Sequence, residues 1–514
     1  MMPAMNISPE KSLQEVLTGF ADIQSKDNCK VTGLSLNSKT AESGNVFFAL
    51  AGTKEHGLNY AAEAIQRGVC AVVWEKGSAQ DDIVMLDDFF HHVPLIPIVD
   101  LKTKLGAIAE KYYDEPSKHL NVYGITGTNG KTSCSHFLAQ VLNQSQKTAI
   151  VGTLGNGYVD RLQEANHTTP DAISLHGLLA QFAEQKTANV VMEVSSHGLS
   201  QGRVSGIAFQ LAIFTNLSRD HLDYHGDMVS YGEAKKLLFQ APTLKTAVIN
   251  VDDDFGGHLA KDLQGKVNLI RYGIDPQQDC EVRASKIRVD NAGLHFDVIT
   301  PWGSGIVSSS LLGRFNVSNL LAVLASLLSL NVRFEEALVR VSRLKNVPGR
   351  MQRISDIPED PLIVVDYAHT PDALDKALQS LREHINGRRK GKVWCVFGCG
   401  GDRDKGKRSL MGEVAEQYSD HVIITDDNPR TEAASHIVSQ ILEGVLKQQN
   451  VTIIHDRVAA IKHALEKVSR TDAILIAGKG HENYQIIGQE RLPYIGDSAV
   501  VKELLSERRK NGGD

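Results

Sequence analysis

The hydrophobic and polar positions of the chain fall into three successive patterns. In the first, short apolar runs at residues 45–50 and 70–75 flank a stretch with helical spacing at 60–68. A polar segment that contains a proline then follows at 112–120. This change of character predicts a smaller N-terminal α/β domain over residues 1–116.

The second pattern is a longer alternation of strands and helices that begins at residue 121. A helix with apolar residues at helical spacing is predicted at 131–142. Short apolar strands are predicted at 121–126, 148–153, 189–194, 211–216 and 246–251. Strands that alternate with helices form parallel sheets covered on both faces. We therefore expect a central domain over residues 117–346. Its apolar run at 320–330 is too short to span a bilayer and is typical of a buried helix.

The third pattern repeats the alternation after a turn-rich linker at 345–352. Apolar strands are predicted within the segments 361–367, 392–398, 420–426, 451–456 and 472–478. Helical segments follow most of them, so residues 347–514 form a second α/β unit of a size suited to one domain. The fold class predicted for the whole chain is therefore α/β, in three domains.

The composition of the chain limits which binding partners and which cellular compartment we expect. The chain has 514 residues, a net charge of −6 and six cysteines without C-x-x-C spacing. A mildly acidic balance argues against a nucleic-acid partner, which requires a basic field. The cysteines fit reduced thiols in a reducing cytosol rather than a zinc module. The N-terminal residues lack the pattern of a secretory signal, so we expect a cytoplasmic protein without membrane insertion.

The segment GITGTNGKT at 124–132 lies between a predicted strand and a predicted helix. The common phosphate-binding loop would have its first glycine at position 125, which is Ile125 here. Even so, Gly127 and Gly130 would let the backbone approach phosphate oxygens at a helix N-terminus. Lys131 could reach the phosphates and Thr132 could ligate Mg²⁺. The alternative is a glycine-rich turn without a ligand, but the complete strand, loop, lysine and helix favour a nucleotide site.

Three later groups of polar residues suit the same site. Glu193 ends a predicted strand, where a carboxylate faces the ligand side of a parallel sheet. The segment 215–226 contains His221 among several acidic and imidazole side chains that could hold a hard cation, although alone it could equally be a polar loop. Lys235 follows in a predicted helix, where lysines are ordinarily solvated. An ammonium would repel a metal ion, whereas the carbamate formed with CO₂ would bind one.

Eleven segments, in this order, resemble the Mur ligases. The resemblance extends from about residue 35 to residue 500. The segments are GITGTNGKT, HTTP, MEVSSHGL, TNLSRDHLDYHG, EAKKLLF, LLGRFNVSN, VPGRMQ, DYAHTPDAL, GCGGDRDKGKR, TDDNPRTE and AGKGHE. Each is weak alone, but together they leave little room for coincidence. The family has the same glycine spacing in its nucleotide loop, and its architecture implies a central ATPase domain with a P-loop-type parallel sheet and a Rossmann-like C-terminal domain.

The resemblance assigns residues to ATP and Mg²⁺. The residues implied to bind ATP are Gly127, Thr128, Asn129, Gly130, Lys131, Thr132, Asn316, Asn319, Asp366 and His369. Those implied to surround Mg²⁺ are Thr132, Glu193, His221 and Lys235, the last as a carbamate. Lys131, Lys235, Glu193 and His221 are the implied catalytic residues.

The resemblance also assigns a site for a UDP-sugar dipeptide. Its implied residues are Ser38, Thr168, Thr169, Ser195, Gln201 and Arg203. The first domain departs from the family pattern, because the chain has Asn-Ser-Lys at 37–39 where D-S-R is frequent. Ser38 is retained as the residue of the uridine pocket, because the resemblance implies that residues 1–116 are a UDP-binding domain.

The segment DDNPR at 426–430 bears on the amino acid that is added. Within the family, ligases that add meso-diaminopimelate resemble it, whereas lysine-adding ligases differ at the arginine. Diaminopimelate has a distal carboxylate, which Arg430 could hold through two parallel hydrogen bonds, with Arg403 assisting. Asp427, Asn428 and Glu482 suit the ammonium group of the same end, with the backbone of Gly478. The alternative is a solvent-facing arginine after a proline turn.

The expected reaction is ATP-dependent amide formation in peptidoglycan synthesis. The γ-carboxylate of UDP-N-acetylmuramoyl-L-alanyl-D-glutamate would attack ATP, and diaminopimelate would displace phosphate from the resulting acyl phosphate. We expect a monomer in the cytoplasm of a bacterium, with small-molecule partners only and closure of the C-terminal domain over ATP. Alternatives are a lysine-adding ligase, a folylpolyglutamate synthetase, or a P-loop NTPase switch that binds a protein partner.

Overall fold

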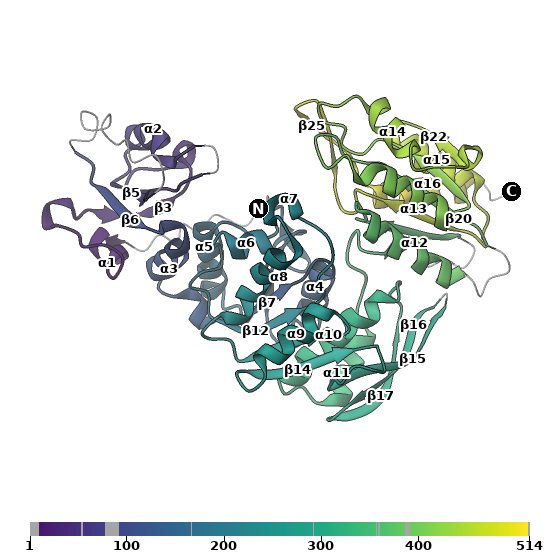
Figure 1. Ribbon diagram of the computed structural model, residues 1–514, viewed down its shortest axis with the longest axis horizontal. Helices are drawn as coiled ribbons and strands as arrows, with labels where there is room; N and C mark the ends of the chain where they lie inside the picture. Colours follow the sequence, from purple (N-terminus) through teal and green to yellow (C-terminus); the bar gives the residue numbers. More distant parts are fainter. Residues whose placement is uncertain are drawn as a thin grey trace. The chain divides into compact units, whose positions relative to one another are not determined.

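The computed structural model (Figure 1) describes residues 10–52, 55–77, 92–165, 167–290, 292–355, 357, 360–385 and 391–511. The chain divides into two compact units, Met1–Arg271 and Tyr272–Asp514. The predicted domain boundaries near residues 116 and 346 lie inside these units and remain predictions. The α/β class is confirmed, because parallel-rich sheets covered by helices occur in both units.

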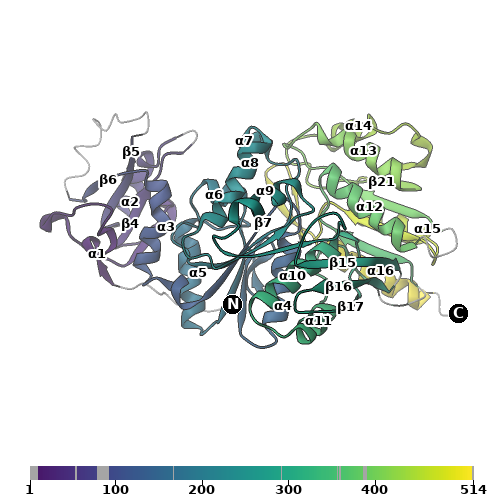
Figure 2. The same cartoon turned by 60° about the horizontal axis from the view of Figure 1, so that its bottom comes forward.

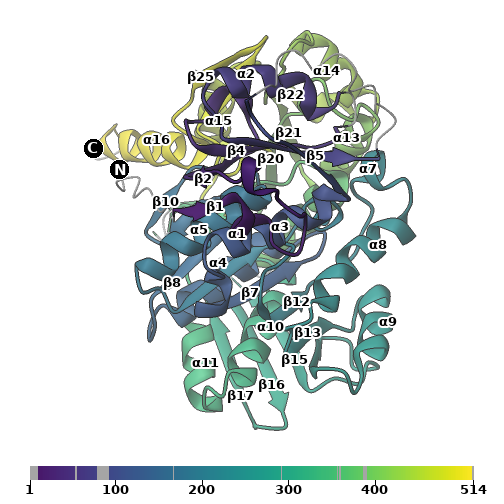
Figure 3. The same cartoon turned by 90° about the vertical axis from the view of Figure 1, so that its left-hand side faces the viewer.

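The first unit begins with a parallel sheet in the order β3-β4-β5-β6. Its strands are β3 (Gly33–Ser35), β4 (Asn45–Ala49), β5 (Ala71–Lys76) and β6 (Leu95–Val99). Figure 3 shows α2 (Ala61–Gln66) on one side of this sheet and both α1 (Leu13–Leu17) and α3 (Leu101–Tyr112) on the other. Because side chains alternate along a strand, Phe48 packs with α1 and α3 whereas Phe47 packs with α2. Strands β1 (Lys11–Ser12) and β2 (Lys30–Val31) form a separate antiparallel pair.

The larger sheet of the first unit has the strand order β10-β9-β8-β11-β7-β12-β13-β14. Its strands are β7 (Asn121–Thr126), β8 (Thr148–Gly152), β9 (Gly155–Tyr158), β10 (Arg161–Gln163), β11 (Asn189–Glu193), β12 (Phe209–Phe214), β13 (Thr246–Asn250) and β14 (Asn268–Gly273). From β8 to β13 neighbouring strands are parallel, and β9 and β10 add an antiparallel edge. The five strands predicted here are confirmed. Since parallel strands share one carboxyl edge, the loops after them gather polar side chains together.

Helices cover this sheet and position the loops at its carboxyl edge. They are α4 (Lys131–Leu142), α5 (Ala172–Glu184), α6 (Ser196–Ser200), α7 (Leu222–His225), α8 (Met228–Lys236) and α9 (Asp254–Leu263). Helix α4 packs on β7, β8 and β11, and Figure 2 shows the helices of this set around β7. Asp171, Ser195 and Asp227 cap α5, α6 and α8 by accepting a hydrogen bond from a backbone N–H of the first turn. The helix predicted at 131–142 matches α4 at both ends.

The second unit begins with an antiparallel meander that the strand–helix pattern did not predict. The meander continues the larger sheet from β14, where Tyr272 pairs with Val282. It consists of β15 (Val282–Asp290), β16 (Gly293–Thr300) and β17 (Gly303–Ser309). More exposed and less exposed residues alternate along β15, as expected of a sheet with one solvated face. The predicted buried helix is present as α10 (Phe315–Ser329), followed by α11 (Phe334–Ser342).

The remainder of the second unit is a mostly parallel sheet in the order β18-β19-β23-β20-β21-β22. Its strands are β18 (Gln352–Arg353), β19 (Leu362–Asp366), β20 (Val393–Phe397), β21 (His421–Ile424), β22 (Val451–Ile453) and β23 (Ala473–Ala477), and β24 (Tyr484–Ile487) and β25 (Glu490–Pro493) form a hairpin. Helices α12 (Pro371–Ile385), α13 (Lys407–Tyr418) and α14 (Ala434–Leu442) cover one face, and α15 (Arg457–Lys467) and α16 (Asp497–Asn511) cover the other. No helix within the described ranges is long and apolar enough to cross a membrane.

Candidate active site

The glycine loop connects β7 to α4, and its glycines are required by geometry. Gly127 has a φ of +150°, and a Cβ added there would lie 1.9 Å from Oγ1 of Thr215. Gly130 has a φ of +87° and is the N-cap of α4. A residue with a side chain would be strained at both positions. The loop therefore presents backbone rather than side chains at the start of α4.

Two residues after β12 fix the shape of this loop. Asn216 accepts hydrogen bonds from the backbone N–H of Thr128 at its carbonyl (2.8 Å) and from that of Asn129 at Oδ1 (2.9 Å). The Thr215 hydroxyl donates to the Asn129 carbonyl over 2.6 Å. Neither residue was among the predicted site residues, although both begin the quoted segment TNLSRDHLDYHG. Their position directly after a strand of the same sheet was the available signal.

The Lys131 ammonium lies against the loop. Its Nζ donates to the carbonyls of Gly127 and Thr128 over 2.7 and 2.9 Å. The first turn of a helix and a lysine at the same loop both favour an anionic ligand. This arrangement fits the phosphates of a nucleotide.

Glu193 and Thr132 meet in the interior of the first unit. The Glu193 side chain is fully buried, and Oε2 accepts hydrogen bonds from the hydroxyls of Thr132 (2.9 Å) and Thr153 (3.1 Å). Its Oε1 accepts from the backbone N–H of Thr153 over 2.9 Å. A carboxylate with three hydrogen-bond donors is satisfied as an anion. Thr153 is a contact that the sequence did not reveal.

Lys235 and His221 belong to a second group, on and beside α8. Lys235 is 1 % exposed, and its Nζ lies 4.3 Å from the ring centroid of Tyr231. Burial, followed by the positive charge of Lys131, lowers the pKa of Lys235 well below its ordinary value. The lowered pKa favours the neutral amine, which is the form that reacts with CO₂. The Tyr231 hydroxyl lies 3.2 Å from that of Thr128, which links this group to the glycine loop.

Three imidazoles, those of His197, His221 and His225, extend the group. The ring of His197 lies 4.9 Å from that of His221 and 5.5 Å from that of His225, between centroids. Burial, together with the neighbouring imidazoles, lowers the pKa of His197 to about 4. His197 is therefore neutral at pH 7. It comes from the quoted segment MEVSSHGL but was not predicted as a site residue.

The predicted metal ligands divide into these two groups. Thr132 and Glu193 offer the hard oxygen atoms that Mg²⁺ prefers, and they are already in contact. Lys235 as an amine does not fit a cation, whereas its carbamate would. Within the described ranges, no three His, Cys, Asp or Glu side chains are grouped as a metal site. The oxygen pair at Thr132 and Glu193 is thus the part of the predicted set that fits Mg²⁺ as it stands.

The residues predicted to hold the UDP-sugar dipeptide in the larger sheet form one hydrogen-bonded chain. Arg203 donates to the Thr169 carbonyl (2.7 Å) and, through Nε and Nη2, to Oε1 of Gln201. The backbone N–H of Ser195 donates to Oγ1 of Thr169 over 3.0 Å. The Thr168 hydroxyl lies 3.0 Å from that of Thr153, which also contacts Glu193. The network therefore extends to the Thr132–Glu193 pair.

Ser38 lies apart from this network, beside the four-stranded sheet. Its hydroxyl is buried and donates to Oε2 of Glu63 over 2.6 Å. Asn37 caps the following turn by accepting a hydrogen bond from the backbone N–H of Lys39. An aspartate could accept the same bond, so the departure from the family's D-S-R leaves this local structure intact.

Four of the predicted ATP contacts lie in the second unit. Asn316 and Asn319 are buried on α10, and Nδ2 of Asn319 donates to Oδ1 of Asn316 over 2.8 Å. Asp366 ends β19 and accepts a hydrogen bond from the backbone N–H of Met351, while burial raises the pKa of its carboxyl. The His369 ring lies 2.8 Å from the Tyr367 carbonyl. Their part in binding ATP remains a prediction.

Arg430 has an unusual backbone conformation, and only one nitrogen of its guanidinium group is hydrogen-bonded within the described residues. Its φ is +51°, in the left-handed region. Nη1 donates to the Gly401 carbonyl over 2.7 Å and contacts the Asn428 carbonyl at 3.4 Å. Within the part of the chain that the structure describes, Nε and Nη2 make no hydrogen bond, so one edge of the fork can take a carboxylate. Arg403 is exposed, and both arginines lie beside Gly400.

Asp427, Asn428 and Glu482 lie together at the ends of β21 and β23. Nδ2 of Asn428 donates to Oε2 of Glu482 over 3.0 Å. Gly478 has a φ of +108°, and a Cβ added there would lie 3.2 Å from Oδ2 of Asp427. The group also contains Lys479, which is fully buried and forms ion pairs with Asp427 and Glu482 at 3.2 and 3.5 Å. Sequence reasoning missed this lysine, because Asp427 and Asn428, two of its partners, lie far from it along the chain.

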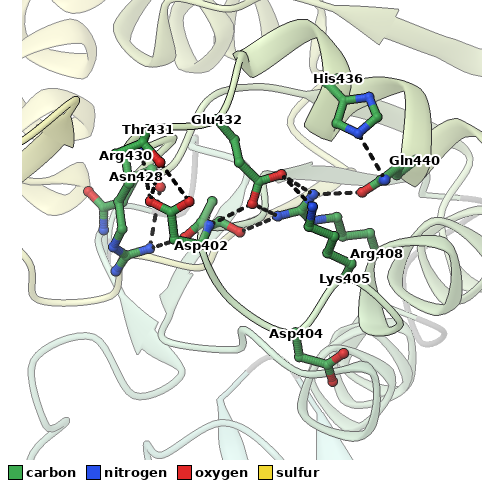
Figure 4. Close-up of polar contacts among 12 residues, drawn as sticks. Asp402, Asp404, Lys405, Arg408, Asn428, Arg430, Thr431, Glu432, His436 and Gln440 are labelled. Atoms are coloured by element: carbon green, nitrogen blue, oxygen red, sulfur yellow. Dashed lines mark hydrogen bonds and ion pairs between the residues drawn. The ribbon is translucent and has the colours of Figure 1, made fainter.

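Figure 4 shows how the loop after β20 is joined to the loop that carries Arg430. The Asp402 carboxylate accepts hydrogen bonds from the backbone N–H and hydroxyl of Thr431. Glu432 accepts from the backbone N–H of Asp402 over 2.6 Å and pairs with the buried guanidinium of Arg408. Hydrogen bonds from Arg408 and from Asp402 lower the pKa of Glu432 to about 2. The two loops are therefore held together at the residues that directly follow Arg430.

Comparison with known proteins shows to which family the chain belongs. The profile of the Mur ligase family catalytic domain matches residues 30–113, that of the Mur ligase middle domain 125–327, and that of the Mur ligase glutamate ligase domain 349–480. A UDP-N-acetylmuramoyl-L-alanyl-D-glutamate–2,6-diaminopimelate ligase of Coxiella burnetii is 45 % identical over 92 % of this chain and 96 % of its own. The chain belongs to the Mur ligase family. The members of this family are ATP-dependent ligases.

Solved structures agree with this assignment. A structure of a UDP-N-acetylmuramoyl-L-alanyl-D-glutamate–2,6-diaminopimelate ligase has a TM-score of 0.69 and 36 % identity, over 97 % of this chain and 99 % of its own. The MurF ligase of Thermotoga maritima, solved in complex with ADP, has a TM-score of 0.61 at 17 % identity, over 96 % of this chain and 100 % of its own. The second likeness establishes the Mur ligase fold alone.

Proposed function

We propose that this Mur ligase joins meso-2,6-diaminopimelate to the D-glutamate of UDP-N-acetylmuramoyl-L-alanyl-D-glutamate, with ATP as the energy source. The observation that carries the proposal is Arg430, whose guanidinium edge is available next to the acidic group of Asp427 and Glu482. A basic fork beside a pair of carboxylates suits an amino-acid end that carries both a carboxylate and an ammonium group. The name of the Coxiella burnetii relative supports the same substrates.

The chemistry requires an activated carboxyl group. A carboxylate is a poor electrophile, so its oxygen first attacks the γ-phosphate of ATP, which forms an acyl phosphate and releases ADP. The diaminopimelate amine then attacks the acyl carbon, and phosphate leaves from the tetrahedral intermediate. Most of the enzyme's work is to hold anionic substrates in position and to offset their charge.

The first unit supplies the groups suited to phosphoryl transfer. The glycine loop and the first turn of α4 would hold the ATP phosphates through backbone N–H groups, and Lys131 would offset their charge. Thr132 and Glu193 would hold Mg²⁺, which neutralises negative charge on the phosphates when bound. Lys235 would join His221 as a ligand after its neutral amine has added to CO₂ and lost a proton. Thr169, Ser195 and the remainder of that network would position the UDP-sugar dipeptide.

The second unit supplies the groups suited to the amino acid. Arg430 would hold the distal carboxylate of diaminopimelate through Nε and Nη2, with Arg403 beside it. Asp427, Asn428 and Glu482 would receive the ammonium group of the same end. Lysine has that ammonium group but lacks the carboxylate, so a lysine-adding enzyme would leave Arg430 without a ligand.

An ADP-release assay with purified protein, MgATP and the UDP-dipeptide tests this specificity. We expect turnover with meso-diaminopimelate and at least about 100-fold lower kcat/KM with lysine, because a bidentate charge-assisted contact is lost. Arg430→Lys should remove most of that preference, since a point ammonium cannot replace a planar fork. Arg382→Lys, which changes an arginine in the part-buried pair with Asp420, is the matched control and should keep the preference. Equal preference in wild type and in Arg430→Lys would contradict the role of Arg430.

The remaining parts of the proposal concern where and how the enzyme acts. Its substrates are small, charged and nucleotide-linked, so we place the enzyme in the bacterial cytoplasm, where ATP is available. We expect a monomer, because every predicted substrate contact is supplied by one chain. Light scattering with size-exclusion chromatography should give a mass near the 56.2 kDa of one chain. A dimer mass would contradict the monomer.

A further inference from the structure

Lys479 is a fully buried lysine in the turn after β23. It lies between Gly478 and Gly480, whose φ values are +108° and +56°. Burying an ammonium group is unfavourable unless it is paired and hydrogen-bonded. A lysine in such a position must therefore be stabilised by partners that accept its hydrogen bonds or carry negative charge.

Those partners include three residues that the proposed function assigns to diaminopimelate. Nζ of Lys479 donates to Oδ1 of Asn428 over 3.0 Å and forms ion pairs with Asp427 and Glu482 at 3.2 and 3.5 Å. It also donates to the Tyr484 carbonyl over 2.9 Å. The rings of Tyr484 and Tyr494 lie 5.8 and 5.9 Å from it, within the range of cation–π attraction.

The lysine determines how the Asn428 side chain is turned. Oδ1 of Asn428 accepts from Lys479 and from the backbone N–H of Ile486 (2.9 Å). Two donors on one side require the amide oxygen there, so Nδ2 is directed to Oε2 of Glu482, 3.0 Å away. Without the ammonium group, one of these donors is lost, and the orientation of the amide is held more weakly.

The lysine also sets the charge of the group. Asp427 and Glu482 carry two negative charges, and Lys479 carries one positive charge, which leaves a net charge of −1. One ammonium group of a substrate complements that charge. Without Lys479 the two carboxylates would repel each other and would attract a cation of any shape, such as a metal ion or a second ammonium.

We infer that Lys479 is a positioning residue for the amino-acid substrate: it holds Asp427, Asn428 and Glu482 in the arrangement that receives one ammonium group. The inference rests on the proposed function. Lys479 itself touches no substrate, because it is enclosed by its partners and fully buried.

The test compares two neutral replacements by steady-state kinetics. Lys479→Met keeps the length of the side chain and removes its donors, and Lys479→Gln keeps a donor for Asn428 without the charge. We expect KM for diaminopimelate to rise at least about 10-fold in Lys479→Met and by less in Lys479→Gln, the scale of one lost charge-assisted hydrogen bond. KM for ATP and for the UDP-dipeptide should stay within about 2-fold, since no residue predicted to bind them is a hydrogen-bond or ion-pair partner of Lys479.

Val500→Ala is the control for a merely structural effect. Val500 is buried in the core of the same part of the chain, so its truncation should lower Tm without changing KM for diaminopimelate. If KM for diaminopimelate is unchanged in both lysine variants, or if KM rises equally for all three substrates, the inference is overturned. It is also overturned if both variants fail to fold while Val500→Ala folds, because Lys479 would then be structural.

The proposed function has a separate outcome in the same experiment. A wild-type enzyme that forms no tripeptide from the three substrates overturns the proposed function, and the inference with it. An active wild-type enzyme whose lysine variants keep the wild-type KM for diaminopimelate overturns the inference alone.

Discussion

Arg408 and Glu432 form a two-pronged ion pair beside the loop of Arg430. Nη1 of Arg408 lies 2.9 Å from Oε2 of Glu432, and Nη2 lies 2.9 Å from Oε1. Arg408 also donates to the Gly400 carbonyl over 3.0 Å. The pair therefore ties the start of the loop after β20 to the residues that follow Arg430. The position of the Arg430 fork depends on this connection.

Replacing Glu432 by glutamine should loosen that connection. Glu432→Gln keeps the size of the side chain but has one oxygen where the carboxylate had two, so it cannot serve both prongs of Arg408. We expect KM for diaminopimelate to rise about 10-fold, with KM for ATP unchanged, because only the amino-acid loops are joined there. Substrate-saturation curves for each substrate measure the effect.

Lys405→Ala provides the matched control. Lys405 lies 3.7 Å from the same Glu432 carboxylate, but its side chain is 60 % exposed. Exposed ion pairs contribute little, so this variant should bind diaminopimelate as the wild type does. An equal rise of KM in both variants would show that bulk charge, rather than the Arg408 pair, is responsible.

The nucleotide loop offers a second test, at Thr132. Thr132→Val removes the hydroxyl that contacts Glu193 and keeps the shape, whereas Thr132→Ser keeps the hydroxyl. We expect the valine variant to lose between about 10- and 100-fold in activity and in affinity for Mg²⁺ with ATP, as is usual when a metal's surroundings are disturbed. The rise of Tm on addition of Mg²⁺ with a non-hydrolysable ATP analogue reports binding without turnover.

The serine variant should retain most of both properties. A valine variant with the wild-type Tm rise would show that the Thr132 hydroxyl has no part in binding the metal–nucleotide complex. The Glu193–Thr132 pair would then be an internal hydrogen bond of the sheet and nothing more.

His384 on α12 predicts a pH dependence of stability in the second unit. Its Nε2 accepts a hydrogen bond from the backbone N–H of Gly313 over 3.0 Å, and its Nδ1 donates to the Asp290 carbonyl over 2.6 Å. Burial lowers the pKa of His384 below its ordinary value of 6.5, with Arg353 acting in the same direction and Asp290 opposing it. A protonated ring could no longer accept the bond from Gly313.

The sign of the effect follows from proton binding. Below pH 6.5 the unfolded chain protonates this imidazole while the folded chain resists, so the unfolded state binds more protons. Stability should therefore fall as pH falls below 6.5. His384→Gln keeps one donor and one acceptor but does not titrate, so its Tm should fall less than that of the wild type between pH 7.5 and pH 5.5. Parallel Tm curves for the two proteins would contradict this account.

The sequence was most informative where structure is set by neighbours along the chain. The strand, glycine loop and helix at 121–142 are present at the predicted bounds, because turn chemistry and helical periodicity are local properties. The predicted apolar runs are also present as strands, namely β7, β8, β11, β12 and β13 in the first unit and β19 to β23 in the second. The meander β15–β17 was missed, because its exposed faces break the apolar runs into alternating residues.

Sequence patterns were limited in the same way at the candidate site. Motifs located Thr132, Glu193 and Arg430, but they could not show that Thr153 joins two parts of the first unit's network or that His197 lies against His221. Lys479 lies inside the quoted motif AGKGHE. Nothing in that motif indicates that the lysine is buried against Asp427 and Asn428. Such contacts depend on tertiary packing, which spacing along the chain does not encode.

The most direct test of the proposed reaction follows the oxygen atoms of the substrate carboxylate. Wild-type protein would be incubated with MgATP, meso-diaminopimelate and UDP-N-acetylmuramoyl-L-alanyl-D-glutamate labelled with ¹⁸O at its γ-carboxylate, and the released phosphate and the tripeptide would be analysed by mass spectrometry. The proposed chemistry predicts one ¹⁸O in each phosphate released and one retained in the new amide, because the attacking carboxylate oxygen leaves with the phosphate. Unlabelled phosphate, or ATP consumption without the tripeptide, would contradict it.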